Sequence, residues 1–399
     1  MTYPTTSPEL TLDFAKSEQL DPRVTFSRSS SATYVGYDGL IKTAPADVAR
    51  FEYDANGKCL GLLIEEARTN NFQYSTELDN AYYDLATGLT KTPNNAVSPD
   101  GNSTALLITE DTSTGEHVFG KTANVPVTNN CMSIFVKPNG KTRVGFVQGS
   151  ETIANVVFDL TGSGSVVSGT GFIEKYANGW YRVTQVRSGT GNKTYFHLLN
   201  NADDALSYTG DGTSGCWIWG YQKEAGTFPT SIIPTAGSTV TRAADVASIT
   251  GTNFSSWYNQ GEGTVLLKST AIKKPSGNSF FFGISDGTVN NRISIYGPFP
   301  DTARGIVVSS GTSIGLSSAI ETGSIFKSAI AVKTGDYGFV HDEMPSPVTS
   351  ASTQVPPVVT TLALGVPYGT GNPDHSFIIS RLTYYPERVS DESLEALTA

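Results

Sequence analysis

Charged side chains are scarce in this chain. Asp, Glu, Lys and Arg make up 16% of its 399 residues, against about 25% in an average soluble domain. Long charged side chains favour helices, so their scarcity argues against a helical protein. Glycine (40) and proline (20) are plentiful, and β-branched and aromatic runs alternate with Gly, Asn and Asp turns. The composition therefore predicts an all-β protein.

Cysteine is also rare. The three cysteines, Cys59, Cys131 and Cys216, are odd in number and far apart, so they form neither a metal-binding pair nor a disulfide framework. We predict buried, reduced thiols; a cross-link to another chain is the alternative.

Long apolar runs are missing. No stretch approaches the roughly 20 residues that span a bilayer, and residues 1–4 lack the basic start of a secretory signal. Both absences predict synthesis in the cytosol, without a signal peptide or membrane insertion. The net charge of −10 repels phosphate backbones, so nucleic acid is not an expected partner.

Catalytic patterns are absent as well. The four histidines are scattered, and no Gly-x-Ser-x-Gly elbow, phosphate loop or zinc-type cluster occurs. Retaining glycosidases need two carboxylates about 5–5.5 Å apart. The neighbours Glu65 and Glu66, like Asp203 and Asp204, would point to opposite faces of a strand. We predict that the chain is not an enzyme, with no catalytic residue.

What is present is a long series of short strands. A chain of this length exceeds the roughly 250–300 residues at which one core stops growing. Residues 1–70 form a hairpin-rich segment with Asp-Gly and Asn-Gly turns. Residues 71–250 and 251–399 each read as an antiparallel β-sandwich. One short helix is predicted after Ser390, whose hydroxyl would cap it, with Asp391 and Glu392 in its first turn.

Three stretches resemble known families. Residues 25–70, with SSSATYVGYDGLIKTAPADVARFEYD followed by GLLIEEARTN, resemble a segment of tailed-phage and prophage virion proteins. Residues 215–251, GCWIWGYQKEAGTFPTSIIPTAGSTVTRAADVASITG, resemble the end of the carbohydrate-binding-like sandwich that usually follows it. The tail ISRLTYYPERVSDESLEALTA resembles the last strand and helix of concanavalin-like, laminin-G-like jelly rolls.

The resemblance implies a virion protein on the particle surface, of the tail fibre, spike or capsid-surface fibre type, often homotrimeric. Residues 1–70 would attach to other virion proteins, and two lectin-like jelly rolls, 71–250 and 251–399, would recognise a host-surface saccharide without cleaving it. Two alternatives remain open. One is a structural cement, collar or fibre component that uses the lectin fold only for assembly, and the other is a polysaccharide-degrading enzyme.

Sugar binding requires an exposed aromatic ring beside hydrogen-bonding groups. The candidates are Trp180, Trp257 and Tyr258. Trp217 and Trp219 share one face of a predicted strand whose other face is also apolar, which favours a buried position for that pair.

Calcium is the one metal considered. Asp203, Asp204 and Asp211 flank a single loop, and carboxylate oxygens on loops suit Ca²⁺. A solvated acidic turn is the alternative, and no other cofactor is expected.

Overall fold

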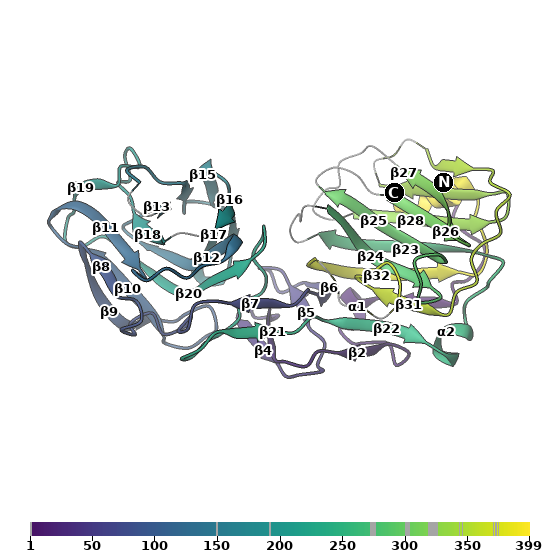
Figure 1. Cartoon of the computed structure of the whole chain (residues 1–399), viewed down its shortest axis with the longest axis horizontal. Coiled ribbons are helices and arrows are strands. Elements are labelled where there is room, and N and C mark those ends of the chain that lie inside the picture. The colour runs from purple at the N-terminus through teal and green to yellow at the C-terminus, as the bar shows by residue number, and fades with distance from the viewer. Residues whose placement is uncertain are drawn as a thin grey trace.

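The computed structural model describes residues 2–399 apart from 149–150, 191–192, 272–276, 300–303, 318–325, 343, 345, 370, 372 and 374. The chain forms two lobes joined by a narrower waist (Figure 1). Its elements are short antiparallel strands with a few short helices, as the composition predicts. The three cysteines are buried and form no disulfide, which confirms the predicted buried thiols.

The second sandwich is the lobe that contains both ends of the chain (Figure 1). Its first layer, sheet I, contains in order β30 (Val348–Ser350), β29 (Tyr337–His341), β28 (Phe326–Lys333), β23 (Glu262–Ala271), β32 (Phe377–Tyr385), β6 (Cys59–Ile64) and β5 (Phe51–Tyr53), with β1 (Leu10–Leu12) also on β32. Its second layer, sheet II, contains β2 (Thr25–Ser27), β22 (Val246–Thr250), β31 (Thr361–Leu364), β24 (Gly277–Ser285), β25 (Arg292–Phe299), β26 (Arg304–Ser309) and β27 (Thr312–Ser317).

The first sandwich is the other lobe. Sheet III contains β16 (Gly171–Lys175), β17 (Tyr181–Thr190), β12 (Thr128–Asn139), β20 (Gly215–Ala225), β10 (Ala105–Glu110) and β9 (Leu89–Ala96). Sheet IV contains β15 (Ser165–Gly169), β14 (Val156–Asp159), β13 (Arg143–Gln148), β18 (Thr194–Leu198), β11 (Thr114–Gly120) and β19 (Ser207–Thr209), with β8 (Leu85–Thr87) also on β11.

Two separate ribbons lie at the waist. They are β3 (Ala32–Val35) with β4 (Ile41–Ala44), and β7 (Arg68–Asn70) with β21 (Val240–Arg242). Gly39 sits in the β3–β4 turn with a φ of 73°, a conformation that a residue with a Cβ adopts only with strain. The Asp-Gly signal therefore marks this hairpin correctly.

The first 70 residues are built into the second sandwich. The sequence divides the chain at residues 70 and 250, but β1, β5 and β6 enter sheet I, while β2 and β22 enter sheet II. In β6, Leu62 to Ile64 pair with Phe377 to Ile379 of β32. Without these strands, β32 would present an unpaired edge, which is a template for aggregation.

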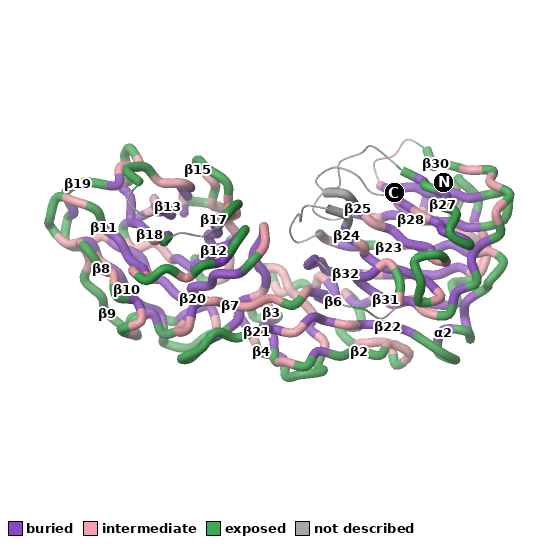
Figure 2. The backbone as a smooth tube through the Cα atoms, viewed as in Figure 1, coloured by how far each residue is buried: buried purple, intermediate pink, exposed green. Residues whose placement is uncertain are grey.

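Each sandwich has its own apolar core between its two sheets (Figure 2). The cores form because alternate residues of each strand face inward; in β25, for example, Ile293 and Ile295 are inside. The remaining elements are the helices α1 (Phe14–Ser17), η1 (Ala177–Gly179), α2 (Thr252–Ser255) and α3 (Asp391–Thr398). In the part of the chain that the structure describes, no helix has the length and apolar character needed to cross a membrane.

The terminal helix α3 confirms the predicted cap. The hydroxyl oxygen of Ser390 accepts a hydrogen bond from the N–H of Ser393 at 3.2 Å. Leu394 is buried on the outer face of sheet I, and Leu397 packs beside it.

Candidate ligand-binding site

The β3–β4 hairpin is held against the first sandwich. The hydroxyl of Thr33 donates to the carbonyl of Ile232 at 2.5 Å, and the N–H of Ile41 donates to the carbonyl of Pro99 at 2.8 Å. Ile41 and Ile232 share an apolar cluster with the outward side chains of sheet III and its neighbours, namely Ala105, Phe135, Trp180 and Trp219. One face of the hairpin is therefore fixed, which leaves the other available to a ligand.

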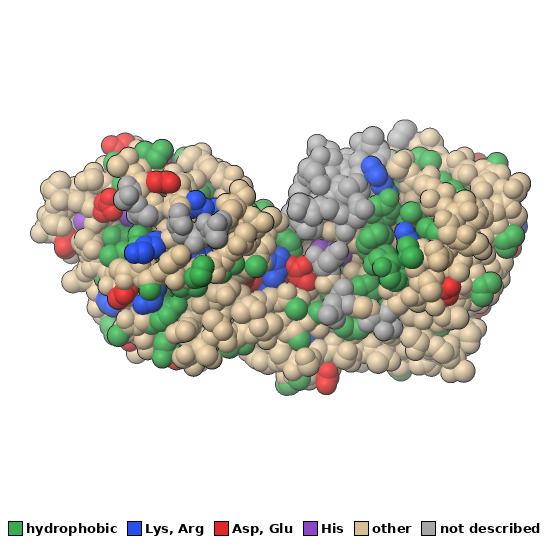
Figure 3. All heavy atoms as spheres, in the orientation of Figure 1, with side chains coloured by type: hydrophobic (Ala, Val, Ile, Leu, Met, Phe, Trp, Pro, Cys, Tyr) green, Lys and Arg blue, Asp and Glu red, His purple; other side chains and the backbone are tan. Residues whose placement is uncertain are grey.

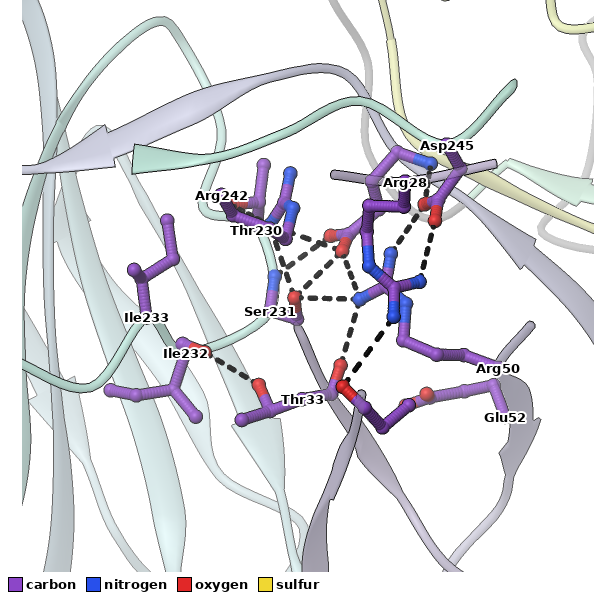
Figure 4. A network of polar contacts seen from close by, with 12 residues as sticks. Arg28, Thr33, Arg50, Glu52, Thr230, Ser231, Ile232, Ile233, Arg242 and Asp245 are labelled. Atoms are coloured by element: carbon purple, nitrogen blue, oxygen red, sulfur yellow. Dashed lines mark hydrogen bonds and ion pairs between the residues drawn. The ribbon is translucent and has the colours of Figure 1, made fainter. Parts of the chain in front are cut away.

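A buried ionic network fixes the hairpin at the waist (Figure 4). Asp245 lies between two guanidinium groups: Arg28 Nη1 is 3.0 Å from Asp245 Oδ1, and Arg50 pairs with the second carboxylate oxygen. Glu65 Oε2 is 2.7 Å from Arg50 Nη1 and 3.1 Å from Arg242 Nη1. All five side chains are almost completely buried. The network joins the N-terminal segment to the linker between the two sandwiches.

Ser231 completes the surroundings of Glu65. Its N–H and its hydroxyl donate to the Glu65 carboxylate at 2.8 Å and 2.6 Å. Burial alone would raise the pKa of Glu65, but the positive charges of Arg242 and Arg50, with these hydrogen bonds, hold the pKa of that carboxyl well below its usual value. The side chains of the network are therefore charged in the folded chain, and the positions of these buried charges are tightly constrained.

A groove of about 510 Å³ opens on the free side of the hairpin, between the end of α1, β3, β4 and β5. Four aromatic side chains line it: Tyr34, Tyr37, Phe51 and Tyr53. Phe51 and Tyr53 face it together because alternate residues of a strand share a face. Tyr37, at the tip of the hairpin, is 73% exposed. We call these residues, with Glu18 and Lys42, the tyrosine groove.

Polar groups sit beside the rings. The hydroxyl of Tyr53 donates to Glu18 Oε2 at 2.8 Å, and burial together with this carboxylate raises the pKa of Tyr53. Glu18 has a φ of 52° because it is the left-handed residue that ends α1, where its N–H donates to the carbonyl of Phe14. Lys42 Nζ lies 2.7 Å from Asp38 Oδ2 at the rim.

This combination suits a polyhydroxylated ligand. A sugar ring presents apolar C–H faces that pack on aromatic rings, and hydroxyls that need donors and acceptors. The tyrosine groove offers both, with a carboxylate and an ammonium group at its edges.

A smaller cavity of about 150 Å³ lies on the other side of β5, against β16 and η1. Its acidic side chains are Glu52, Asp54 and Glu174. Burial raises the pKa of Glu52 to about 8, even though its carboxylate accepts a hydrogen bond from the N–H of Val35 at 3.1 Å. Glu52 therefore keeps its proton near neutral pH.

The aromatic residues selected from the sequence lie elsewhere. Trp180, Trp257 and Tyr258 are only 1%, 5% and 8% exposed. Trp180 belongs to the cluster beneath the hairpin, whereas Trp257 and Tyr258 pack with Phe254 and Tyr384 in the second sandwich. The structure does not bring these residues together, and none presents a ring face to solvent.

The three aspartates considered as calcium ligands, Asp203, Asp204 and Asp211, each contact different groups. Asp211 accepts hydrogen bonds from Thr213 and Ser214, while Asp204 Oδ1 is 3.6 Å from an Arg143 nitrogen. Within the ranges that the structure describes, no group of three or more His, Cys, Asp or Glu residues could hold a metal ion.

The tyrosine groove was missed at the sequence level. Tyr34, Tyr37 and Tyr53 lie within 20 residues of one another in the hairpin-rich segment, so tyrosine density around two Gly-containing turns was the available signal. This signal was not decisive, because whether the tyrosines of the two hairpins face one another depends on how the hairpins pack.

Comparison with known proteins gives a limited likeness. No protein-family model matches the chain, and no curated protein matches it. Among solved structures, the CBM40 domain of Ruminococcus gnavus IT-sialidase bound to α2,3 sialyllactose aligns with 13% identity and a TM-score of 0.32, over 37% of this chain and 88% of that one. The NanB sialidase of Streptococcus pneumoniae aligns with 14% identity and a TM-score of 0.32, over 37% of this chain and 26% of that one.

The receptor-binding domain of botulinum neurotoxin C/D mosaic serotype aligns with 10% identity and a TM-score of 0.31, over 39% of this chain and 40% of that one. Likenesses of this size carry no conclusion about a ligand of this chain.

Proposed function

We propose that the chain is a saccharide-binding protein and that the tyrosine groove is its binding site. The observation that carries the proposal is the groove itself: four aromatic side chains, one of them 73% exposed, beside a carboxylate held by Tyr53. Aromatic faces flanked by fixed polar groups are what recognition of a sugar ring requires.

The setting that we propose is the surface of a tailed-phage particle. This part rests on the sequence resemblance of residues 25–70 and 215–251. It includes attachment to other virion proteins and a homotrimeric state. Detection of the chain in purified particles tests the setting, and mass measurement of the purified chain tests the homotrimeric state. A monomer in solution would contradict a trimer of the isolated chain.

We propose binding without cleavage. Hydrolysis with retention needs a second carboxylate about 5–5.5 Å from the first, and among the described residues that line the groove Glu18 is the only acidic one. Asp38, at the rim, is paired with Lys42.

One observation favours polysaccharide cleavage as a second candidate function. The neighbouring cavity contains Glu52, whose pKa is raised to about 8, together with Asp54 and Glu174. A protonated acid beside other carboxylates is the arrangement used for general acid catalysis. Product analysis of every bound saccharide separates the two functions: cleavage by the wild type that E52Q abolishes would replace the binding proposal.

The test of the main proposal is a screen of the full chain against bacterial-surface saccharides, followed by calorimetric titration of each hit. We expect Y37A to weaken binding about tenfold or more, because the ring loses its stacking contact with the sugar. Y3A is the matched control, since Tyr3 is also exposed, at 64%, and is not part of the groove. A folded chain that binds no saccharide, or equal losses in Y37A and Y3A, would contradict the proposal.

A further inference from the structure

The outer face of sheet II carries a strip of polar and aromatic side chains along β25. Because Ile293 and Ile295 face the core, the alternate residues Arg292, Ser294 and Tyr296 lie on the outer face of the sheet. Ser294 is buried there beneath the loop after β31, and its hydroxyl donates to the carbonyl of Pro367 at 3.4 Å. In Figure 3, hydrophobic side chains gather on this lobe over the region of β24 and β25, with Lys or Arg side chains beside them.

Aromatic and basic groups meet at one end of this strip. Tyr296 pairs with Phe280 of β24 on one side and with Arg304 of β26 on the other. The rings of Phe280 and Tyr296 stack with centroids 5.0 Å apart and planes inclined by 21°. A stacked aromatic pair therefore lies beside Arg304 on the neighbouring strand.

Aromatic and basic groups also meet at the other end of the strip. Arg292 begins β25, and the loop after β31 is fastened next to it: the N–H of Gly369 donates to Ser285 Oγ at 3.1 Å. This loop brings Tyr368, which is 42% exposed, into the electrostatic surroundings of Arg292. Tyr296 lies four positions after Arg292, so the two ends lie about 13 Å apart along the strand.

Over the described ranges, no Asp or Glu forms an ion pair with Arg292 or Arg304, and the Nε atom of each is buried without a hydrogen-bond acceptor. Arg292 Nη1 donates to the carbonyl of Val289, a neutral acceptor. Burial lowers the pKa of Arg292 because water is removed from the charged group. In a chain of net charge −10, two guanidinium groups without a carboxylate partner among the described residues favour a ligand that brings its own negative charge.

We propose that the β25 strip, defined as Arg292, Tyr296, Phe280 and Arg304, binds an extended carboxylate-bearing polysaccharide. Sugar rings pack against the Phe280–Tyr296 pair, and carboxylates of acidic sugars pair with Arg304 and Arg292. The strip lies on a different sandwich from the hairpin of the tyrosine groove and is independent of it.

The test uses the full chain and three probes: polygalacturonate, alginate and hyaluronate. Their carboxyl-reduced forms serve as matched neutral controls. We expect binding of at least one acidic form, weaker at high salt, and none of its reduced form. R304Q and R292Q should each weaken that binding about tenfold, because each removes a charge-assisted hydrogen bond.

Two variants check the location. R23Q, at a surface arginine paired with Asp21, and Y3A, at an exposed tyrosine outside the tyrosine groove, should leave binding of the acidic polysaccharide unchanged. Circular dichroism and melting temperature confirm folding of each variant. The proposal is overturned if no acidic form binds, if the reduced form binds equally, or if R304Q and R292Q bind like R23Q.

Discussion

Two glutamates of the N-terminal segment show how the surroundings of a carboxyl group decide its charge. Burial opposes ionisation of both Glu52 and Glu65. Arg242 and Arg50 overcome this effect at Glu65, so its pKa is lowered, whereas at Glu52 burial outweighs the positive charge of Arg50 and the pKa rises to about 8. The same residue type is therefore a fixed anion at one position and a neutral acid at the other.

The raised pKa of Glu52 predicts a pH-dependent stability. Its protonated form stabilises the fold fully below the ordinary pKa of 4.5, and this contribution is lost as the pH rises through about 8. E52Q, which stays neutral and still accepts from Val35, should match the wild type at pH 4. At pH 9 it should exceed the free energy of unfolding of the wild type by about 4–5 kcal/mol, because the pKa shift from 4.5 to about 8 is worth about 1.4 kcal/mol per unit.

Urea unfolding at both pH values measures the effect of E52Q. E9Q, at an exposed glutamate, is the control and should show no difference that grows with pH. A constant offset between E52Q and the wild type from pH 4 to pH 9 would contradict the prediction.

At the scale of elements, the ribbons of the waist are held by charges rather than by an extensive core. Arg28 follows β2, Arg50 precedes β5, and Glu65 follows β6, while Asp245 precedes β22. A single carboxylate, Asp245, also accepts the N–H of Glu65 at 2.9 Å. Loss of that charge would remove the ion-pair partner of the buried Arg28 and leave Arg50 paired with Glu65 alone.

We therefore expect D245N to lower the free energy of unfolding by about 3–5 kcal/mol, the usual cost of breaking a buried ion pair. D21N is the matched control, because Asp21 pairs with Arg23 at the surface and should contribute less than about 1 kcal/mol. Denaturant unfolding of both variants at one pH measures the difference, and equal small losses would show that the network contributes little.

At the scale of the whole molecule, the N-terminal segment connects the two sandwiches. Its strands complete both sheets of the second sandwich, and its hairpin covers the outer face of sheet III in the first. The tyrosine groove exists only because this segment is held on both sides.

Removal of residues 1–70 should therefore damage the second sandwich most. A chain of residues 71–399 lacks β6 and β1 beside β32 and lacks β2 beside β22, so we expect exposed edges, aggregation and a loss of cooperative unfolding. Light scattering and calorimetry measure this. A chain lacking only residues 1–7, which precede the first strand, is the control; similar melting of both shortened chains would refute the connecting role.

The sequence by itself determined the features that depend on neighbouring residues. The all-β class, the hairpin of β3 and β4, and the Ser390 cap of α3 follow from local composition, turn residues and capping chemistry, which act over a few positions. The pairing of β32 with β6 and β1, the burial of Trp180 and the tyrosine groove were decided by the tertiary structure alone. Many strands of this chain share the same apolar pattern, so local sequence cannot select a partner some 300 residues away; only the packing of complete sheets does so.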